Sequence, residues 1–189
     1  MRELMHKYFA KVVDAPTKST RAQSLWRGDQ RWTNPAWTFE MTRALASAAN
    51  DLLPDKRIAA KGVGDSYGRH EYLTLDVTTY DDTSWKWPAI IVEHENSPSA
   101  EKLRYCAWKL LSVRADMRVL VAYVDSTRRY SWCPSSPEAL LSILAPVAAD
   151  HRDQALTVFV GEWCGDLERS GWRGIFEVHH ANVRSSASQ

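Results

Sequence analysis

The chain has 189 residues, a net charge of +1, 44% hydrophobic residues and 25% charged residues. This length and composition are typical of one globular domain with a proper core. The near-zero net charge argues against a protein that coats nucleic acid through bulk charge. Nine tryptophans are many for this length, and a surplus beyond the core can serve as a stacking surface or an interface.

The cysteines and the apolar runs bear on the compartment. Cys106, Cys133 and Cys164 form no CxxC pair, which argues against a zinc knuckle and a disulfide framework and fits a reducing cytoplasm. The N-terminus has no apolar signal core, and no run approaches membrane-spanning length. We therefore expect a cytoplasmic protein with no membrane partner.

The N-terminal segment, residues 1–33, is basic. Residues 1–31 carry seven Lys and Arg against three acids, so the segment can track a phosphate backbone. A solvated basic arm is the commoner interpretation of such a segment. Residues 1–13 predict a short helix, and residues 14–33 look irregular. The apolar stripe of that helix is Leu4, Tyr8 and Val12.

Turn and cap signals divide the rest of the chain into helices and strands. Asn34-Pro35 predicts a helix start that runs to Pro54, and Ser97-Pro98 repeats the signal for a helix to about Arg114. A third helix is predicted around Pro137–Ala149. The predicted strands are Leu73–Tyr80, Ala89–Glu95, Arg118–Val124, Thr157–Trp163 and Gly174–His180.

This order of elements predicts the fold class. Helices and strands alternate without an internal repeat or a long linker, so we expect one α/β domain over residues 1–189, with a mixed β-sheet core flanked by helices. Residues 182–189 are expected to be a disordered tail.

The clearest chemistry lies between Leu73 and Glu95. Asp76 lies in the first of two predicted strands, and Glu93 and Glu95 end the second. Strand side chains alternate between faces, so Glu93 and Glu95 point the same way and His94, interpreted as a packed histidine, points the other way. If the strands pair, Asp76 joins a three-carboxylate cluster suited to Mg²⁺ or Mn²⁺. Two acids at this spacing are also common on a solvent-facing strand.

A helix, a hairpin with Asp and then Glu-x-Glu, a helix and a strand resemble the core of the PD-(D/E)xK nucleases over about residues 34–124. The resemblance implies a restriction-endonuclease-like fold, in which Asp76 matches the family's single Asp and Glu93 its middle acid. Glu95 stands where the family usually has Lys. Some restriction enzymes carry Glu there, and others move the Lys to the following helix, where Lys102 lies.

The resemblance implies a Mg²⁺-dependent endonuclease acting on nucleic acid, on DNA rather than RNA, and it allows a homodimer. Metal held by Asp76 and Glu93 would polarise the phosphate and lower the pKa of a bound water. Glu95 would accept a proton or add a metal ligand. Lys102 would stabilise charge on the phosphate in the transition state, although a lysine in a first helical turn is more often simply solvated. Lys109, two turns further on, is less well placed.

Two other interpretations stay open. The same fold can serve as a binding or interaction module without catalysis, which the missing Lys and the near-neutral charge favour. The chain can also be a metal-binding α/β enzyme with a small substrate.

Overall fold

The structure, a computed structural model, divides into two compact units. The first unit is Met1–His94 with Arg114–Met117, and the second is Glu95–Val113 with Arg118–Gln189. Each unit contains helices and strands, which confirms the predicted α/β class. The expectation of one domain over the whole chain stays a prediction. The described residues are 2–18, 34–63, 74–81, 87–97, 99–128, 130–151, 154–162, 171–178 and 183–186.

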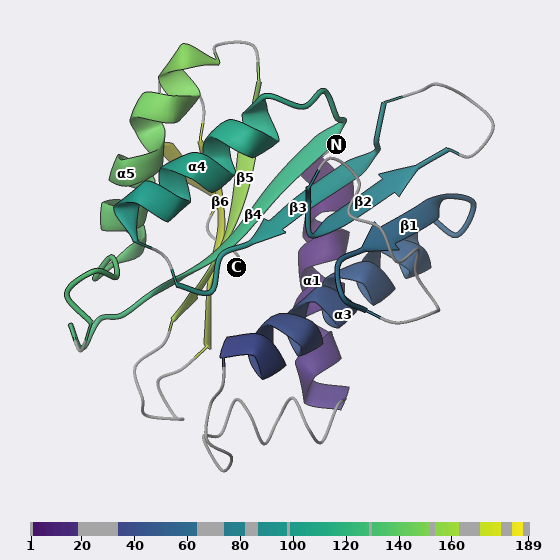
Figure 1. The fold of residues 1–189 in the computed structure, drawn as a ribbon, viewed down its shortest axis with the longest axis horizontal. Helices are drawn as coiled ribbons and strands as arrows, with labels where there is room; N and C mark the ends of the chain where they lie inside the picture. The colour runs from purple at the N-terminus through teal and green to yellow at the C-terminus, as the bar shows by residue number, and fades with distance from the viewer. Residues whose placement is uncertain are drawn as a thin grey trace. The chain divides into compact units, whose positions relative to one another are not determined.

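Over its described residues, the first unit joins two helices to three antiparallel strands. Its strands follow the order β1-β2-β3, with Ile58 opposite Thr79 and Val77 opposite Val92. Helix α3 packs on these strands, and α1 packs on α3 (Figure 1). The bounds are α1 (Arg2–Lys18), α3 (Asn34–Leu52), β1 (Arg57–Ala60), β2 (Val77–Tyr80) and β3 (Ile90–His94).

Helix α1 is longer than predicted, because it continues to Lys18. Its buried stripe packs on α3, where the Tyr8 hydroxyl donates to the Leu45 carbonyl at 3.0 Å. Two of its lysines form ion pairs: Lys7 with Glu3 and Lys11 with Asp51. In the first unit α1 is therefore a packed helix, and residues 19–33 of the basic segment lie outside the described residues.

In the part that the structure describes, the second unit has a mixed sheet and two helices. Strands β4 and β5 are parallel and joined through α5, while β5, β6 and β7 are antiparallel. Helices α4 and α5 pack against each other (Figure 1). Its central strands are buried along their length, as the apolar runs predict. The bounds are α4 (Ala100–Leu111), β4 (Met117–Val124), α5 (Pro137–Asp150), β5 (Leu156–Glu162), β6 (Gly171–Val178) and β7 (Val183–Ser186).

The structure corrects three details of the sequence prediction. Helix α4 is capped by Ser99, whose side chain accepts from the Lys102 backbone N–H, rather than by Ser97. Strand β1, which pairs with β2, is not among the predicted strands. Residues 183–186, inside the tail expected to be disordered, form strand β7. They are ordered because pairing with β6 satisfies their backbone hydrogen bonds. Within the described residues, no helix is both long and apolar enough to cross a membrane.

Candidate functional site

In the first unit, Asp76 reaches the end of β3. Its backbone N–H donates to the Val92 carbonyl at 3.1 Å, and its carboxylate Oδ2 accepts from the His94 backbone N–H at 2.8 Å. Asp76 directly precedes β2, whose first residue Val77 lies opposite Val92. The antiparallel pairing therefore places the Asp76 carboxylate against the peptide that joins Glu93 to His94. The strand predicted over Leu73–Tyr80 is shorter in the structure, because β2 begins at Val77 and Asp76 lies just before it.

The end of β3 is buried although it carries polar residues. Ile90, Ile91 and Val92 are fully buried, and Glu93 and His94 follow with only 5% and 7% exposed. Burial lowers the pKa of His94 to about 3, so its imidazole is neutral at pH 7. The prediction of a packed His94 fits this position. Burying the Glu93 carboxylate has a free-energy cost that solvent-facing acids on a strand avoid, so the solvated-strand interpretation does not apply to Glu93.

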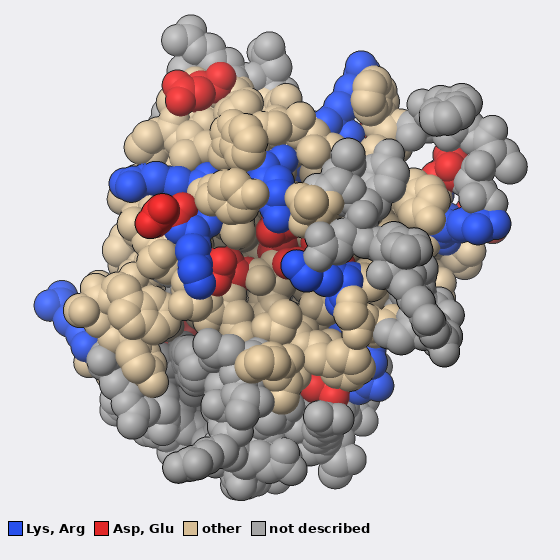
Figure 2. All heavy atoms as spheres, in the orientation of Figure 1, with Lys and Arg blue, Asp and Glu red and all other residues tan. Residues whose placement is uncertain are grey.

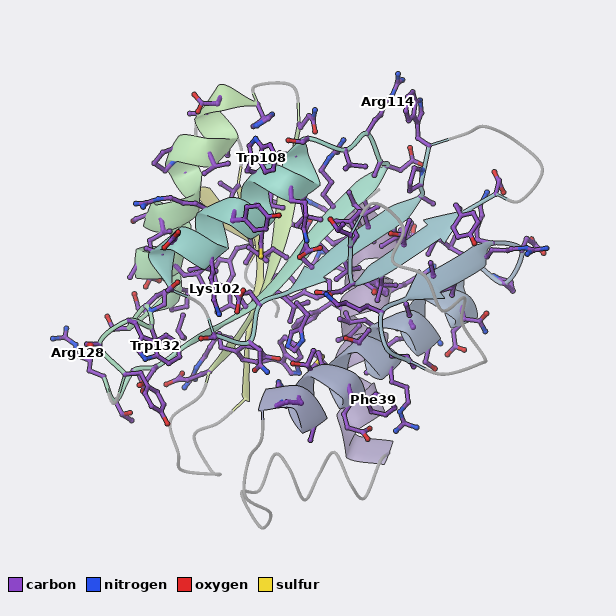
Figure 3. The ribbon with its side chains drawn as sticks, viewed as in Figure 1. Phe39, Lys102, Trp108, Arg114, Arg128 and Trp132 are labelled. Carbon is purple, nitrogen blue, oxygen red and sulfur yellow. The ribbon has the colours of Figure 1, made fainter. Side chains whose placement is uncertain are left out.

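In the second unit, Glu95 and Lys102 come together. Lys102 Nζ lies 4.0 Å from Glu95 Oε1, with the lysine half exposed and the glutamate largely covered. Figure 3 shows Lys102 extending from α4. The Ser97 backbone N–H donates to Glu95 Oε1 at 2.6 Å, and the Cys106 thiol lies 3.9 Å from Oε2. The Ser99 cap puts Lys102 in the first turn of α4, from which its side chain can reach the preceding loop.

Lys109 does not share this position. Its ammonium group lies 5.6 Å from the ring centroid of Tyr105, over the outer face of α4. Two turns separate it from the first turn of the helix, where Lys102 meets Glu95. Lys102 is therefore the lysine of α4 that approaches a predicted site acid, in agreement with the spacing in the sequence.

The four predicted residues are thus divided between the two units, and Glu95 and Lys102 are the two whose side chains the structure brings together. Asp76 and Glu93 belong to the first unit, and Glu95 and Lys102 to the second. Among the described residues, which include all three acids, no group of three His, Cys, Asp or Glu side chains is placed to hold a metal ion. Convergence of Asp76, Glu93 and Glu95 on one ion stays a prediction.

A second set of buried acids, which the sequence analysis missed, lies at the carboxyl ends of β4 and β5. Val124, the last residue of β4, lies opposite Glu162 in the parallel register. Glu162 is buried and contacts both Ser126 and Arg173. An acid at the end of each buried apolar run was the signal that could have found them. These groups are paired within the protein, and the Glu162–Arg173 pair joins β5 to β6.

Asp125, the residue after β4, shapes the loop that follows. Its carboxylate accepts hydrogen bonds from the Thr127 backbone N–H, the Thr127 hydroxyl and the Tyr130 backbone N–H. This loop presents Tyr130 and Trp132, whose rings lie 5.2 Å apart and are partly exposed. Burial, with a contribution from Asp125, raises the pKa of the Cys133 thiol to about 12. Asp125 is therefore a structural acid that holds a surface loop in one conformation.

Comparisons of this chain with protein-family models, with characterised proteins and with solved structures give no match. The interpretation of the site consequently depends on the residues and geometry of this chain.

Proposed function

We propose that this protein is a metal-dependent nuclease with a restriction-endonuclease-like fold that hydrolyses phosphodiester bonds in nucleic acid, DNA in the first instance. The observation that carries the proposal is the hydrogen bond from the His94 backbone N–H to the Asp76 carboxylate. It holds an acid from the start of one strand against the end of its neighbour, beside the buried Glu93. An acid just before one strand and an acid on its antiparallel neighbour are close to the arrangement that the PD-(D/E)xK resemblance implies.

The donor chemistry of Asp76 and Glu93 suits Mg²⁺. This ion prefers oxygen ligands and is commonly held by one or two protein carboxylates, with waters and substrate phosphates as its other ligands. A pair of carboxylates is therefore enough, and a third protein ligand is not required. When bound, the ion would supply Lewis acidity and make a water more acidic. Asp76 would orient it, because the His94 N–H fixes the direction of the carboxylate.

In this proposal Glu95 and Lys102 together take the role of the single lysine in the family motif. Lys102 is half exposed and within 4.0 Å of Glu95, so its ammonium group can meet a phosphate that arrives from solvent. There it would stabilise charge that develops in the transition state. Glu95 is held by the Ser97 N–H and restrains Lys102; it would also accept a proton from the attacking water.

The test is hydrolysis of DNA and RNA with Mg²⁺ or Mn²⁺ by the parent protein and by matched variants. We expect Asp76→Asn to abolish cleavage, because it removes a metal ligand, while the control Asp51→Asn, an exposed α3 acid, leaves cleavage unchanged. Lys102→Ala should lower turnover more than substrate binding, and the control Lys7→Ala, an exposed α1 lysine, should not. Full activity of Asp76→Asn would refute the site.

One observation favours a second candidate, a non-catalytic interaction module. The Glu95 carboxylate is engaged by the Ser97 N–H and Lys102, which is also what a purely structural acid would show. Calorimetry and melting with Mn²⁺ separate the candidates, because an ion that binds only the folded state stabilises it by about 2.7 kcal/mol at a hundredfold excess over Kd. Absence of both metal binding and cleavage would select the module.

A further inference from the structure

The outer face of α4 exposes two aromatic rings that stack on each other. Tyr105 and Trp108 have 57% and 52% of their surface exposed. Their ring centroids lie 6.0 Å apart with planes 28° from parallel. The apolar stripe of the helix faces the other way and is buried, so these rings are not needed to cover the core. Large aromatic surface left in water is unfavourable and marks an interaction site more often than chance.

The charges around these rings are mostly positive. Helix α4 carries Lys102, Arg104 and Lys109 against the single acid Glu101. The Lys109 ammonium group lies over the Tyr105 ring, so its positive charge stays next to the two aromatic rings. Figure 2 shows Lys and Arg atoms over the surface of α4, with a smaller area of Asp and Glu atoms. The net charge of the whole chain is only +1, so this excess of cations is a local feature. An anionic partner with flat aromatic groups complements it.

The two rings, Tyr105 and Trp108, form a platform on the same helix that carries Lys102 of the candidate site. Lys102, Tyr105 and Lys109 follow at spacings of three and four residues, so their side chains lie on neighbouring turns of one face. With a rise of about 1.5 Å per residue, Trp108 lies about 9 Å along the helix from Lys102. Figure 3 shows both side chains on α4. A nucleic-acid strand whose bases stack on the rings would thus extend its sugar-phosphate backbone toward Lys102 and Glu95.

We propose that the Tyr105–Trp108 platform of α4 binds single-stranded nucleic acid, with bases stacked on the two rings and phosphates paired with the flanking cations. Stacking on aromatic side chains together with a positive surface is how proteins bind single strands without strict sequence preference. Bases inside a duplex are covered by their own neighbours, so the platform selects unpaired segments. Binding at α4 does not require catalysis; that a bound strand is then cut rests on the proposed nuclease function.

Binding is tested without metal, so that it does not depend on cleavage. The fluorescence anisotropy of a labelled single-stranded oligonucleotide, titrated with protein in EDTA, gives Kd for parent and variants. Removing a base-stacking ring weakens single-strand binding by about 5- to 150-fold. We expect this for Trp108→Ala, a larger effect for Tyr105→Ala combined with Trp108→Ala, and near-parent affinity for Trp108→Phe. Lys109→Ala should flatten the salt dependence of log K by about 0.7 for each phosphate that the variant no longer neutralises.

The matched control is Trp87→Ala. Trp87 is equally exposed, at 55%, and also has a cation over its ring, Arg114 at 4.7 Å, but it belongs to the first unit. The Trp87→Ala variant should bind the oligonucleotide as the parent does, and a blunt duplex should bind the parent more weakly than the single strand.

Equal Kd values for Trp108→Ala and the parent would overturn the proposal. So would a shift in oligomeric state on Trp108→Ala without a change in affinity, which would make α4 a protein interface. Tight single-strand binding without cleavage would keep this inference and refute only the nuclease function.

Discussion

The burial of His94 predicts that the free energy of unfolding decreases as the pH falls below neutrality. His94 ends β3 with 7% of its surface exposed, and burial lowers the pKa of its imidazole from 6.5 to about 3. Below pH 6.5 the unfolded chain takes up a proton at this residue while the folded protein does not. The stability that comes from a neutral His94 is therefore fully present above pH 6.5 and is lost progressively as the pH falls toward 3.

The magnitude follows from the pKa difference. One pKa unit corresponds to about 1.4 kcal/mol, so His94 should make the free energy of unfolding fall by about 1.4 kcal/mol per pH unit in this window. Over the whole window the decrease is on the order of 4–5 kcal/mol. Small domains have unfolding free energies of about 5–15 kcal/mol, so this one residue can bring the protein close to acid unfolding.

Urea unfolding at a series of pH values between about 4.5 and 7.5 measures this effect. We compare the slope of unfolding free energy against pH in the parent and in His94→Asn, because the slope difference removes both the intrinsic effect of the substitution and the titration of other groups. His94→Asn should reduce this slope by about 1.4 kcal/mol per pH unit. Parallel curves for His94→Asn and the parent would show that the folded protein protonates His94, and would refute the reasoning.

Two further predictions concern the second unit. Gly161→Ala should lower the free energy of unfolding by about 1–3 kcal/mol in urea titrations, because an added Cβ would meet the buried Tyr123 ring at 2.7 Å; unchanged stability would mean that the ring moves away at no cost. Asp125→Ala should speed trypsin cleavage after the exposed Arg128, measured by mass spectrometry, because the loop loses the acceptor of three hydrogen bonds; an unchanged cleavage rate would contradict the role given to Asp125.

Local signals in the sequence are enough to predict most of the elements. Asn34-Pro35 begins α3, and Pro137 begins α5, where the sequence predicts. The buried strands β4 and β5 match the predicted apolar runs to within one residue. These elements carry their own caps and hydrophobic periodicity, so no knowledge of distant partners is needed to find them.

The missed strands show where local signals fail. Arg57–Ala60 is only four residues long, and it is a strand because β2 supplies its hydrogen-bond partners. Val183–Ser186 is polar and pairs with β6. The partner of β1 is distant in sequence, whereas β7 pairs with the strand that directly precedes it; in both cases the partner lies outside the segment, so the propensity of the segment alone does not encode the pairing. The predicted cap of α4 is wrong for a different reason: Ser97 and Ser99 flank Pro98 and serine can cap a helix at either place, and the Ser99 side chain is the one that accepts from the Lys102 backbone N–H.

The candidate site divides in the same way. The spacing after Glu95 predicts that Lys102 lies in the first turn of α4, where the structure has it, because helix geometry alone fixes that placement. The hydrogen bond of Asp76 to the His94 N–H depends on the pairing of β2 with β3, and sequence can state it only as a condition. Whether Asp76, Glu93 and Glu95 share a metal ion depends on residues of both units, so a measurement of metal binding is needed to test it.

The platform on α4 can be predicted from the sequence in part. Leu103, Cys106 and Leu110 define the buried stripe, and at 100° per residue Tyr105 and Trp108 fall off it. Composition alone would assign these rings to the core, whereas periodicity places them in solvent. The stacking of the rings and the position of Lys109 over Tyr105 depend on side-chain conformations. We infer that a large aromatic residue that lies off the apolar stripe of its own helix and beside cations signals a binding face, and Trp108→Ala tests this inference directly.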